Sequence, residues 1–133
     1  MGGGWQGSLE DYAAVMIGGA LGATARWRLA GVVQRHAGVF FPWGTLVVNL
    51  LGSFLLGFVM GATVNYGVFA RWERLLLATG FAGAFTTFST FAYESLVLAV
   101  REPIYAVTNV VVNILLGLAM VYLGAVIAGV VYG

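Results

Sequence analysis

The chain contains no cysteine and no lysine, only two prolines, and few charged side chains of either sign. Without cysteine, neither disulfides nor thiolate metal sites are available. Only 8% of the 133 residues are charged and the net charge is +1, which gives no case for nucleic-acid binding. Hydrophobic residues make up 61% and the mean hydropathy is +0.96. Because a soluble domain carries about 25% charged residues, this composition predicts an integral membrane protein without room for an enzyme domain.

Four hydrophobic segments are long enough to cross a bilayer as helices, which takes about 20 residues. They are predicted over residues 12–33, 44–64, 75–98 and 103–131. Pro42 precedes the second segment and Pro103 begins the fourth, at a position where a missing N–H is harmless. Residues 1–11 are predicted to be a flexible leader, and residues 12–133 a single all-α transmembrane domain.

The middle of the third segment has an unusual composition for a membrane helix. Residues 80–91 read GFAGAFTTFSTF, so glycines, hydroxyls and spaced phenylalanines replace plain aliphatic residues. A glycine-loosened, hydroxyl-rich stretch at the midplane is how membrane proteins expose backbone carbonyls to an ion. The pattern predicts a third helix broken in mid-membrane, near Thr86 and Thr87, in a protein that moves or holds an ion.

Polar side chains recur at helical spacing within three of the predicted spans. They are Thr45, Asn49 and Ser53 on the second, Thr86 and Thr90 on the third, and Asn109 and Asn113 on the fourth. Such residues cost free energy in a membrane unless they are paired or line a path. A lone hydroxyl such as that of Ser53 is readily satisfied by its own helix, but three asparagines together favour an aqueous or ion-lined route.

The polar stripes contain amide and hydroxyl donors and no carboxylate. Between Asp11 and Glu73 the sequence has no acidic residue, whereas a proton-coupled cation exporter needs an acid near the midplane of its spans. Glu94 is the only acid within a predicted span, where it fits either an interfacial residue or one that lines a vestibule. Uncharged donors, with the positive ring edges of Phe88 and Phe91, suit a small anion.

The arginines are divided between the two ends of the predicted bundle. One end has Arg26, Arg28, Arg35 and Arg101, and the other has Arg71 and Arg74. Because so small a difference is a weak orientation signal, the chain can insert both ways and pair as an antiparallel dimer. The alternative is a single orientation with the first end cytoplasmic. Four helices are too few to enclose a polar path, so a homo-oligomer is expected, with close-packing faces at Gly18, Gly22, Gly57 and Gly61.

Three motifs closely resemble the Fluc (CrcB) family of fluoride channels. They read GGALGATARW at 18–27, PWGTLVVNLLGSF at 42–54 and GFAGAFTTFSTF at 80–91. The resemblance extends from about Met16 to the end of the fourth span. It implies a dual-topology homodimer in the bacterial inner membrane, with two pores that each use both subunits. The function implied is passive, fluoride-selective efflux that protects the cell from fluoride toxicity.

The same resemblance implies roles for individual residues. Asn49, Phe88 and Phe91 match the family's pore residues, and Thr45, Ser53, Thr90, Asn109 and Asn113 are further candidates for the fluoride path. Gly83 and Thr86 match the helix break whose backbone carbonyls, from both subunits, hold a structural sodium ion. Arg26 and Glu94 are placed at the vestibule. The chain departs from many members at Asn109 and Asn113, where tyrosine and serine are common, and at Ala84, where a second glycine is usual.

Two other functions compete with this interpretation. A small multidrug-type exporter also has four spans and dual topology, but the first span here lacks a carboxylate. A non-transporting membrane assembly subunit would use the same polar residues only to hold its helices together, and it would conduct nothing.

Overall fold

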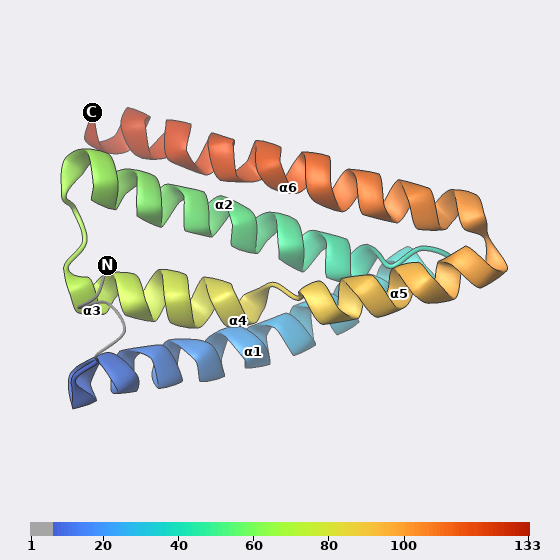
Figure 1. Ribbon diagram of the computed structural model, residues 1–133, viewed down its shortest axis with the longest axis horizontal. Coiled ribbons are helices and arrows are strands. Elements are labelled where there is room, and N and C mark those ends of the chain that lie inside the picture. The colour runs from blue at the N-terminus through green and yellow to red at the C-terminus, as the bar shows by residue number, and fades with distance from the viewer. Residues whose placement is uncertain (1–6) are drawn as a thin grey trace.

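The computed structural model describes residues 7–133, and this part of the chain is helical almost throughout (Figure 1). The elements are α1 (Leu9–Ala37), α2 (Trp43–Tyr66), α3 (Arg71–Arg74), η2 (Leu75–Ala82), α4 (Gly83–Phe85), α5 (Phe88–Arg101) and α6 (Pro103–Tyr132). The π-helix η2 joins α3 to α4 without a gap, so residues 71–85 form one continuous helical rod. Each of the four predicted segments is helical, the third apart from two residues at 86–87, and the helices extend slightly beyond the predicted bounds.

The first helix begins earlier than the sequence predicts. Leu9, Glu10 and Asp11 belong to α1 rather than to a leader, because Ser8 caps the helix. The Ser8 hydroxyl accepts from the Asp11 N–H at 3.3 Å, and the Asp11 carboxylate accepts from the Ser8 N–H at 3.1 Å. The rest of the predicted leader, residues 1–6, lies outside the described residues.

Three helical stretches are long and apolar enough to cross a membrane: Trp43–Tyr66, Arg71–Arg101 and Pro103–Tyr132. The prediction of an all-helical membrane protein is thereby confirmed. The 29-residue α1 has the necessary length but is more polar, with acidic residues in its first turn and basic residues in its last.

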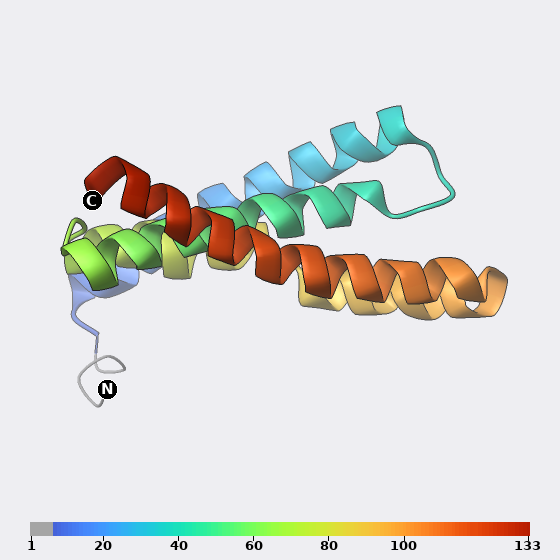
Figure 2. The same cartoon turned by 90° about the horizontal axis from the view of Figure 1, so that it is seen from above.

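The helices run back and forth along one long axis (Figure 1). The α2–α3 connection and the C-terminus lie at one end, and the α1–α2 and α5–α6 connections lie at the other. Toward that second end α1 and α2 diverge from α5 and α6 (Figure 2). An ion pair at the first end joins α1 to α3, with Arg71 and Asp11 3.2 Å apart. Hydrogen bonds from the Arg71 guanidinium lower the pKa of the Asp11 carboxyl below its ordinary value.

Close helix crossings depend on glycine. A Cβ atom added to Gly22 in α1 would lie 2.3 Å from the carbonyl oxygen of Phe81 in η2. One added to Gly57 in α2 would lie 2.0 Å from the carbonyl oxygen of Val121 in α6. Backbones that approach so closely leave no room for a side chain. The glycine faces predicted to drive close packing are therefore used inside the chain.

The third long helix is interrupted where the sequence predicts it. After α4 ends at Phe85, Thr86 adopts φ −86° and ψ 162°, and Thr87 adopts φ −147° and ψ 115°. Both conformations are extended, so two residues separate α4 from the start of α5 at Phe88. The Thr87 hydroxyl caps α5 by accepting from the Thr90 N–H at 3.2 Å.

Candidate ion site at the helix break

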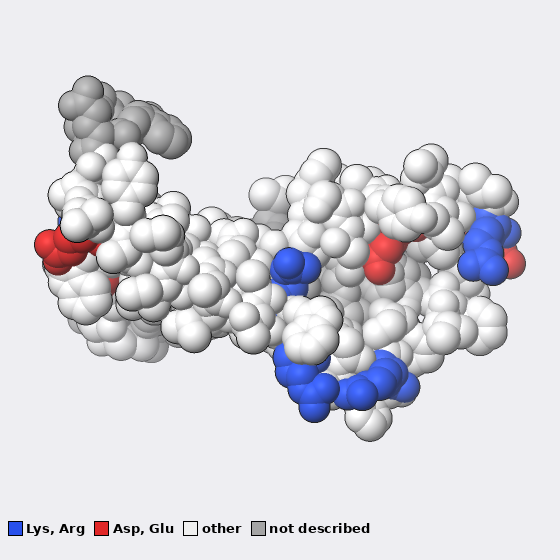
Figure 3. Space-filling view, turned by 90° about the horizontal axis from the view of Figure 1, so that it is seen from below, with Lys and Arg blue, Asp and Glu red and all other residues white. Residues whose placement is uncertain are grey.

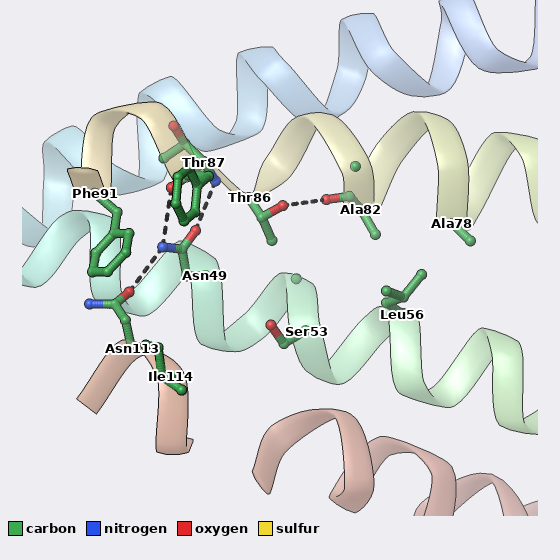
Figure 4. A pocket seen from close by; sticks show the side chains of 13 residues that line it. Asn49, Ser53, Leu56, Ala78, Ala82, Thr86, Thr87, Phe91, Asn113 and Ile114 are labelled. Carbon is green, nitrogen blue, oxygen red and sulfur yellow. Dashed lines mark hydrogen bonds between the residues drawn. The ribbon is translucent and has the colours of Figure 1, made fainter. Parts of the chain in front are cut away.

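Asn49 of α2 lies directly against the interruption (Figure 4). Its side-chain oxygen accepts from the Thr87 N–H at 2.8 Å, and its Nδ2 donates to the Thr87 carbonyl at 3.3 Å. These bonds supply partners for backbone groups that no longer have any in a helix. The side chain of Asn49, from α2, therefore stabilises the non-helical backbone between α4 and α5.

A cavity of about 310 Å³ lies beside this contact, and none of its lining residues is charged. It brings together seven of the residues that the sequence singles out: Asn49, Ser53, Gly83, Thr86, Phe88, Phe91 and Asn113. They come from α2, α4, α5, α6 and the break itself. The cavity offers amides, hydroxyls and aromatic rings in a largely apolar surrounding, and such a lining can bind a small ion without a fixed opposite charge.

The two phenylalanines of α5 meet edge to face. Their ring centroids are 5.6 Å apart and the ring planes are inclined by 64°. Phe91 is buried at 8% exposure, whereas Phe88 is 77% exposed. The pair therefore reaches from the interior of the chain to its surface, with one ring edge directed at the other ring's face.

A chain of hydrogen bonds continues from Asn49 into α6 and α5. Asn49 Nδ2 donates to Asn113 Oδ1 at 3.0 Å, and Asn113 Nδ2 donates to Asn109 Oδ1 at 2.9 Å. Asn109, fully buried, donates from Nδ2 to the Ser95 hydroxyl at 2.9 Å. Ser95 is absent from the sequence prediction. Its position one helical turn beyond Phe91 was the available signal, but only the α5–α6 packing shows that Asn109 meets it.

Three other predicted path residues do not line this cavity. Asn109 is behind Asn113 in the hydrogen-bonded chain. Thr90 accepts a hydrogen bond from the Thr87 hydroxyl at 3.0 Å, as part of the cap of α5. Thr45 is buried one turn before Asn49 and lies outside the cavity lining.

Glu94 lines a second and larger cavity of about 850 Å³ between the diverging helix pairs. Its other lining residues include Gln34 of α1, Arg101 at the end of α5 and Tyr105 of α6. Glu94 Oε1 is buried and has no hydrogen-bond partner among the described residues. Figure 3 shows one face of the molecule in space-filling form. On this face, charged side chains lie near the left end and on the right half, and the surface between them carries none.

The carbonyl groups at the end of α4 are unequally satisfied. The Ala82 carbonyl accepts from Thr86, and the Ala84 carbonyl accepts from Arg26 Nε at 3.1 Å. Within the described part of the chain, the carbonyl oxygens of Gly83 and Thr86 accept no hydrogen bond. These are the two groups that the sequence predicts as sodium ligands. Hard, uncharged oxygens left without donors fit a small hard cation.

Arg26 occupies an unexpected position. The sequence places it at a vestibule, but its guanidinium reaches from α1 to the end of α4 and bonds the Ala84 carbonyl. A cation at the carboxyl end of a helix is favourable, because unpaired carbonyls give that end a partial negative charge. In a single chain, Arg26 is therefore a cap for the interrupted helix.

The fold and the cavity together define an all-helical membrane protein with an interrupted helix beside a cluster of uncharged donors. The chain belongs to the CrcB-like protein family (Camphor Resistance, CrcB), whose model matches residues 13–125. It is 47% identical over 123 residues to the "Fluoride-specific ion channel FluC" of Legionella pneumophila (strain Paris), with 90% of each chain covered. It is 46% identical over 123 residues to the protein of that name from Pyrococcus furiosus, covering 90% of this chain and 97% of the relative. "Fluoride-specific ion channel FluC 1" of Methanosarcina acetivorans is 47% identical over 113 residues, with 84% and 86% covered.

Proposed function

We propose that this protein is a fluoride channel that lets fluoride leave the cell passively and so protects it from fluoride toxicity. The observation that carries the proposal is the contact of Asn49 with the helix break, inside a cavity that has donors but no charged residue. Relatives at 46–47% identity are named as fluoride-specific ion channels. The sequence motifs, the fold and the family therefore support the same function.

The chemistry of fluoride explains why a passive path is sufficient. Neutral HF crosses the membrane of an acidified cell and dissociates in the more alkaline cytoplasm, where the ion is trapped. A channel in the plasma membrane, which is the inner membrane of a bacterium, lets the anion leave. The inside-negative potential favours exit by about 2.3 kcal/mol per charge per 100 mV. Donors such as those of Asn49 and Ser53 would replace the hydration shell of the ion.

The working unit we propose is an antiparallel homodimer in which each chain crosses the membrane four times. The arginines at both ends of the molecule support insertion in either orientation. The site is incomplete in one chain, since Phe88 is 77% exposed beside the cavity. A second copy that packs against this surface would enclose the path. On this assignment α1 crosses the membrane in addition to the three apolar stretches, with Asp11 and Arg35 near its two ends.

A sodium ion at the dimer axis is the cofactor that we propose. Gly83 and Thr86 would hold it through their backbone carbonyls, one pair from each chain. When bound, the ion supplies positive charge to oxygens that otherwise remain unpaired in a dry interior, and it acts as a structural staple. Arg26 and Glu94 remain the candidates for the vestibules, Glu94 through the larger cavity that it lines.

The test is fluoride efflux from liposomes that contain the purified protein, recorded with an ion-selective electrode beside a chloride control. Rapid fluoride release with little chloride release is the expected result. Release of neither ion from folded dimer would reject the channel and favour an assembly subunit. Fluoride-independent transport of an organic cation coupled to protons would favour an exporter, although the cavity lacks the carboxylate which that mechanism needs.

A further inference from the structure

The side-chain amide of Asn49 has no free hydrogen. One of its two N–H groups is directed to the Thr87 carbonyl at 3.3 Å, and the other to Asn113 Oδ1 at 3.0 Å. Its oxygen accepts from the Thr87 N–H at 2.8 Å. An anion in the cavity therefore meets an amide whose donors are already engaged, and it must displace one of these internal acceptors.

The amide of Asn113 is engaged in the same way. Its Nδ2 donates to the Asn109 carbonyl at 2.8 Å and to Asn109 Oδ1 at 2.9 Å. Asn109 Nδ2 donates to the Ser95 hydroxyl, and Ser95 donates to the Phe91 carbonyl at 2.8 Å. Asn49, Asn113, Asn109 and Ser95 form what we call the donor relay, in which each member donates to the next.

Backbone groups fix the direction of the donor relay. The Thr87 N–H can only donate, so the atom of Asn49 that faces it must be the oxygen. The Asn109 carbonyl can only accept, so the atom of Asn113 beside it must be the nitrogen. The Phe91 carbonyl likewise requires Ser95 to donate, which leaves the Ser95 oxygen to accept from Asn109. Turning any one amide would set donor against donor or acceptor against acceptor.

We propose that the donor relay sets the anion selectivity of the channel, with Asn113 Oδ1 as the acceptor with which a permeating anion must compete. This inference rests on the proposed function and concerns the same cavity. Hydrogen bonds to a charged acceptor are roughly twice as strong as neutral ones. Fluoride, the smallest halide, concentrates its charge and accepts strongly enough to draw an N–H of Asn49 away from Asn113. Chloride is larger and a weaker acceptor, so it cannot offset the loss of that bond.

The geometry favours this role for Asn113 over that of a direct donor. Asn113 lines the cavity, but both of its hydrogens are directed away to Asn109, which is fully buried. Only its oxygen is directed at Asn49. Asn109 and Ser95 are outside the cavity lining and act as positioning residues that hold this oxygen in place.

The first test removes the competing acceptor with Asn113→Ser, whose short side chain does not reach Asn49. Thr108→Val is the matched control, because Thr108 is exposed on the same helix and bonds only its own Ile104 carbonyl. Fluoride and chloride efflux from liposomes are measured for wild type and both variants. In Asn113→Ser we expect the ratio of chloride to fluoride efflux to rise at least about tenfold, because one N–H of Asn49 is then free. The control should keep the wild-type ratio.

Two results would overturn the inference while leaving the channel function intact. One is a wild-type ratio of chloride to fluoride efflux in Asn113→Ser. The other is loss of fluoride efflux in a folded Asn113→Ser dimer, which would make Asn113 a direct ligand. If wild type itself releases no fluoride, the proposed function fails and this inference fails with it.

A second test measures ion binding directly in the wild-type protein and uses variants only to assign signals. It is practical because the chain has only four asparagines. Protein labelled with ¹⁵N at asparagine gives four side-chain amide signal pairs, assigned by single replacements. Sodium fluoride should shift the Asn49 and Asn113 pairs, whereas sodium chloride at the same concentration should not. Asn65, exposed at the end of α2, is the internal reference. An equal response to both salts, or none to fluoride, contradicts the inference.

Discussion

Arg26 Nε donates to the carbonyl oxygen of Ala84 at 3.1 Å, although the two residues are 58 positions apart in the chain. The bond joins α1 to the end of α4, where the third long helix is interrupted. The positively charged guanidinium of Arg26 therefore connects the first helix to the backbone that shapes the candidate ion site.

The first prediction concerns this contact. Replacing Arg26 with glutamine should destabilise the folded protein by about 1.5–3 kcal/mol, the usual worth of a hydrogen bond to a charged group. Arg28→Gln is the matched control, because Arg28 is exposed on the same helix. Thermal unfolding in detergent measures the difference. If both variants unfold at the wild-type temperature, the Arg26 contact has no structural role.

The second prediction separates the donors of Asn49 from its shape. Asn49→Asp keeps the size of the side chain but exchanges its two N–H donors for negative charge beside the proposed anion path. Fluoride efflux should fall at least about tenfold, equivalent to about 1.4 kcal/mol in the barrier, while the dimer remains intact by size exclusion. Asn65→Asp makes the same change at an exposed site on α2 and should leave efflux unchanged. Wild-type efflux from the Asn49 variant would remove Asn49 from the path.

Phe88 allows a third test, in which only the aromatic ring changes. Phe88→Ile keeps an apolar side chain but removes the edge-to-face contact with Phe91, 5.6 Å away between ring centroids. Because ring edges are weak donors to an anion, fluoride efflux should fall while the dimer stays folded. Tyr122→Ile is the comparison, since Tyr122 is 73% exposed on α6 and outside both cavities. Normal efflux in Phe88→Ile would exclude Phe88 from the ion path.

The glycines of α1 give a prediction in which two changes have opposite signs. Gly22→Ala places a Cβ 2.3 Å from the Phe81 carbonyl oxygen and should destabilise by about 1–3 kcal/mol through overpacking. Gly31→Ala meets nothing within 4 Å, so in the same helix it should stabilise by up to about 1 kcal/mol through helix propensity. Unfolding by a denaturing detergent compares the two. Equal effects would show that the α1–η2 crossing is looser than described.

The fifth prediction tests the sodium assignment without any mutation. Exchanging sodium for N-methylglucamine at constant ionic strength should lower the unfolding temperature of the dimer. If the free sodium concentration is about 100 times the dissociation constant of the site, binding contributes about 2.7 kcal/mol to the stability of the folded protein. An unfolding temperature that is the same in both salts would count against a structural cation at Gly83 and Thr86.

The sequence was sufficient to predict the four long helices and the interruption, for identifiable reasons. Long apolar runs have few alternatives to helices, and the cluster of glycine and threonine around Thr86 is costly in a plain membrane helix. Asn49 and Asn113 could be selected because an amide in an apolar segment requires a partner. The sequence also indicated the phenylalanine pair by its spacing of three residues.

What the sequence could not supply was the pairing between helices. Arg26 was placed at a vestibule by the family resemblance, and its bond to the Ala84 carbonyl could not be foreseen because a backbone carbonyl has no signature in the sequence. Ser95 was missed because its importance depends on which face of α6 meets α5. The start of α1 at Leu9 depends on the capping box formed by Ser8 and Asp11, a local signal that the prediction did not use.

The interruption at Thr86 and Thr87 also divides one helical dipole into two. The rod of residues 71–85 ends there with its partially negative carbonyl end, which faces the Arg26 guanidinium. The 14-residue α5 begins there with its partially positive amide end, next to Phe88 and the cavity. A single interruption thus creates a cation-attracting end and an anion-attracting start within two residues. In a chain with so few charged side chains, much of the local field at the candidate site is produced by its own backbone.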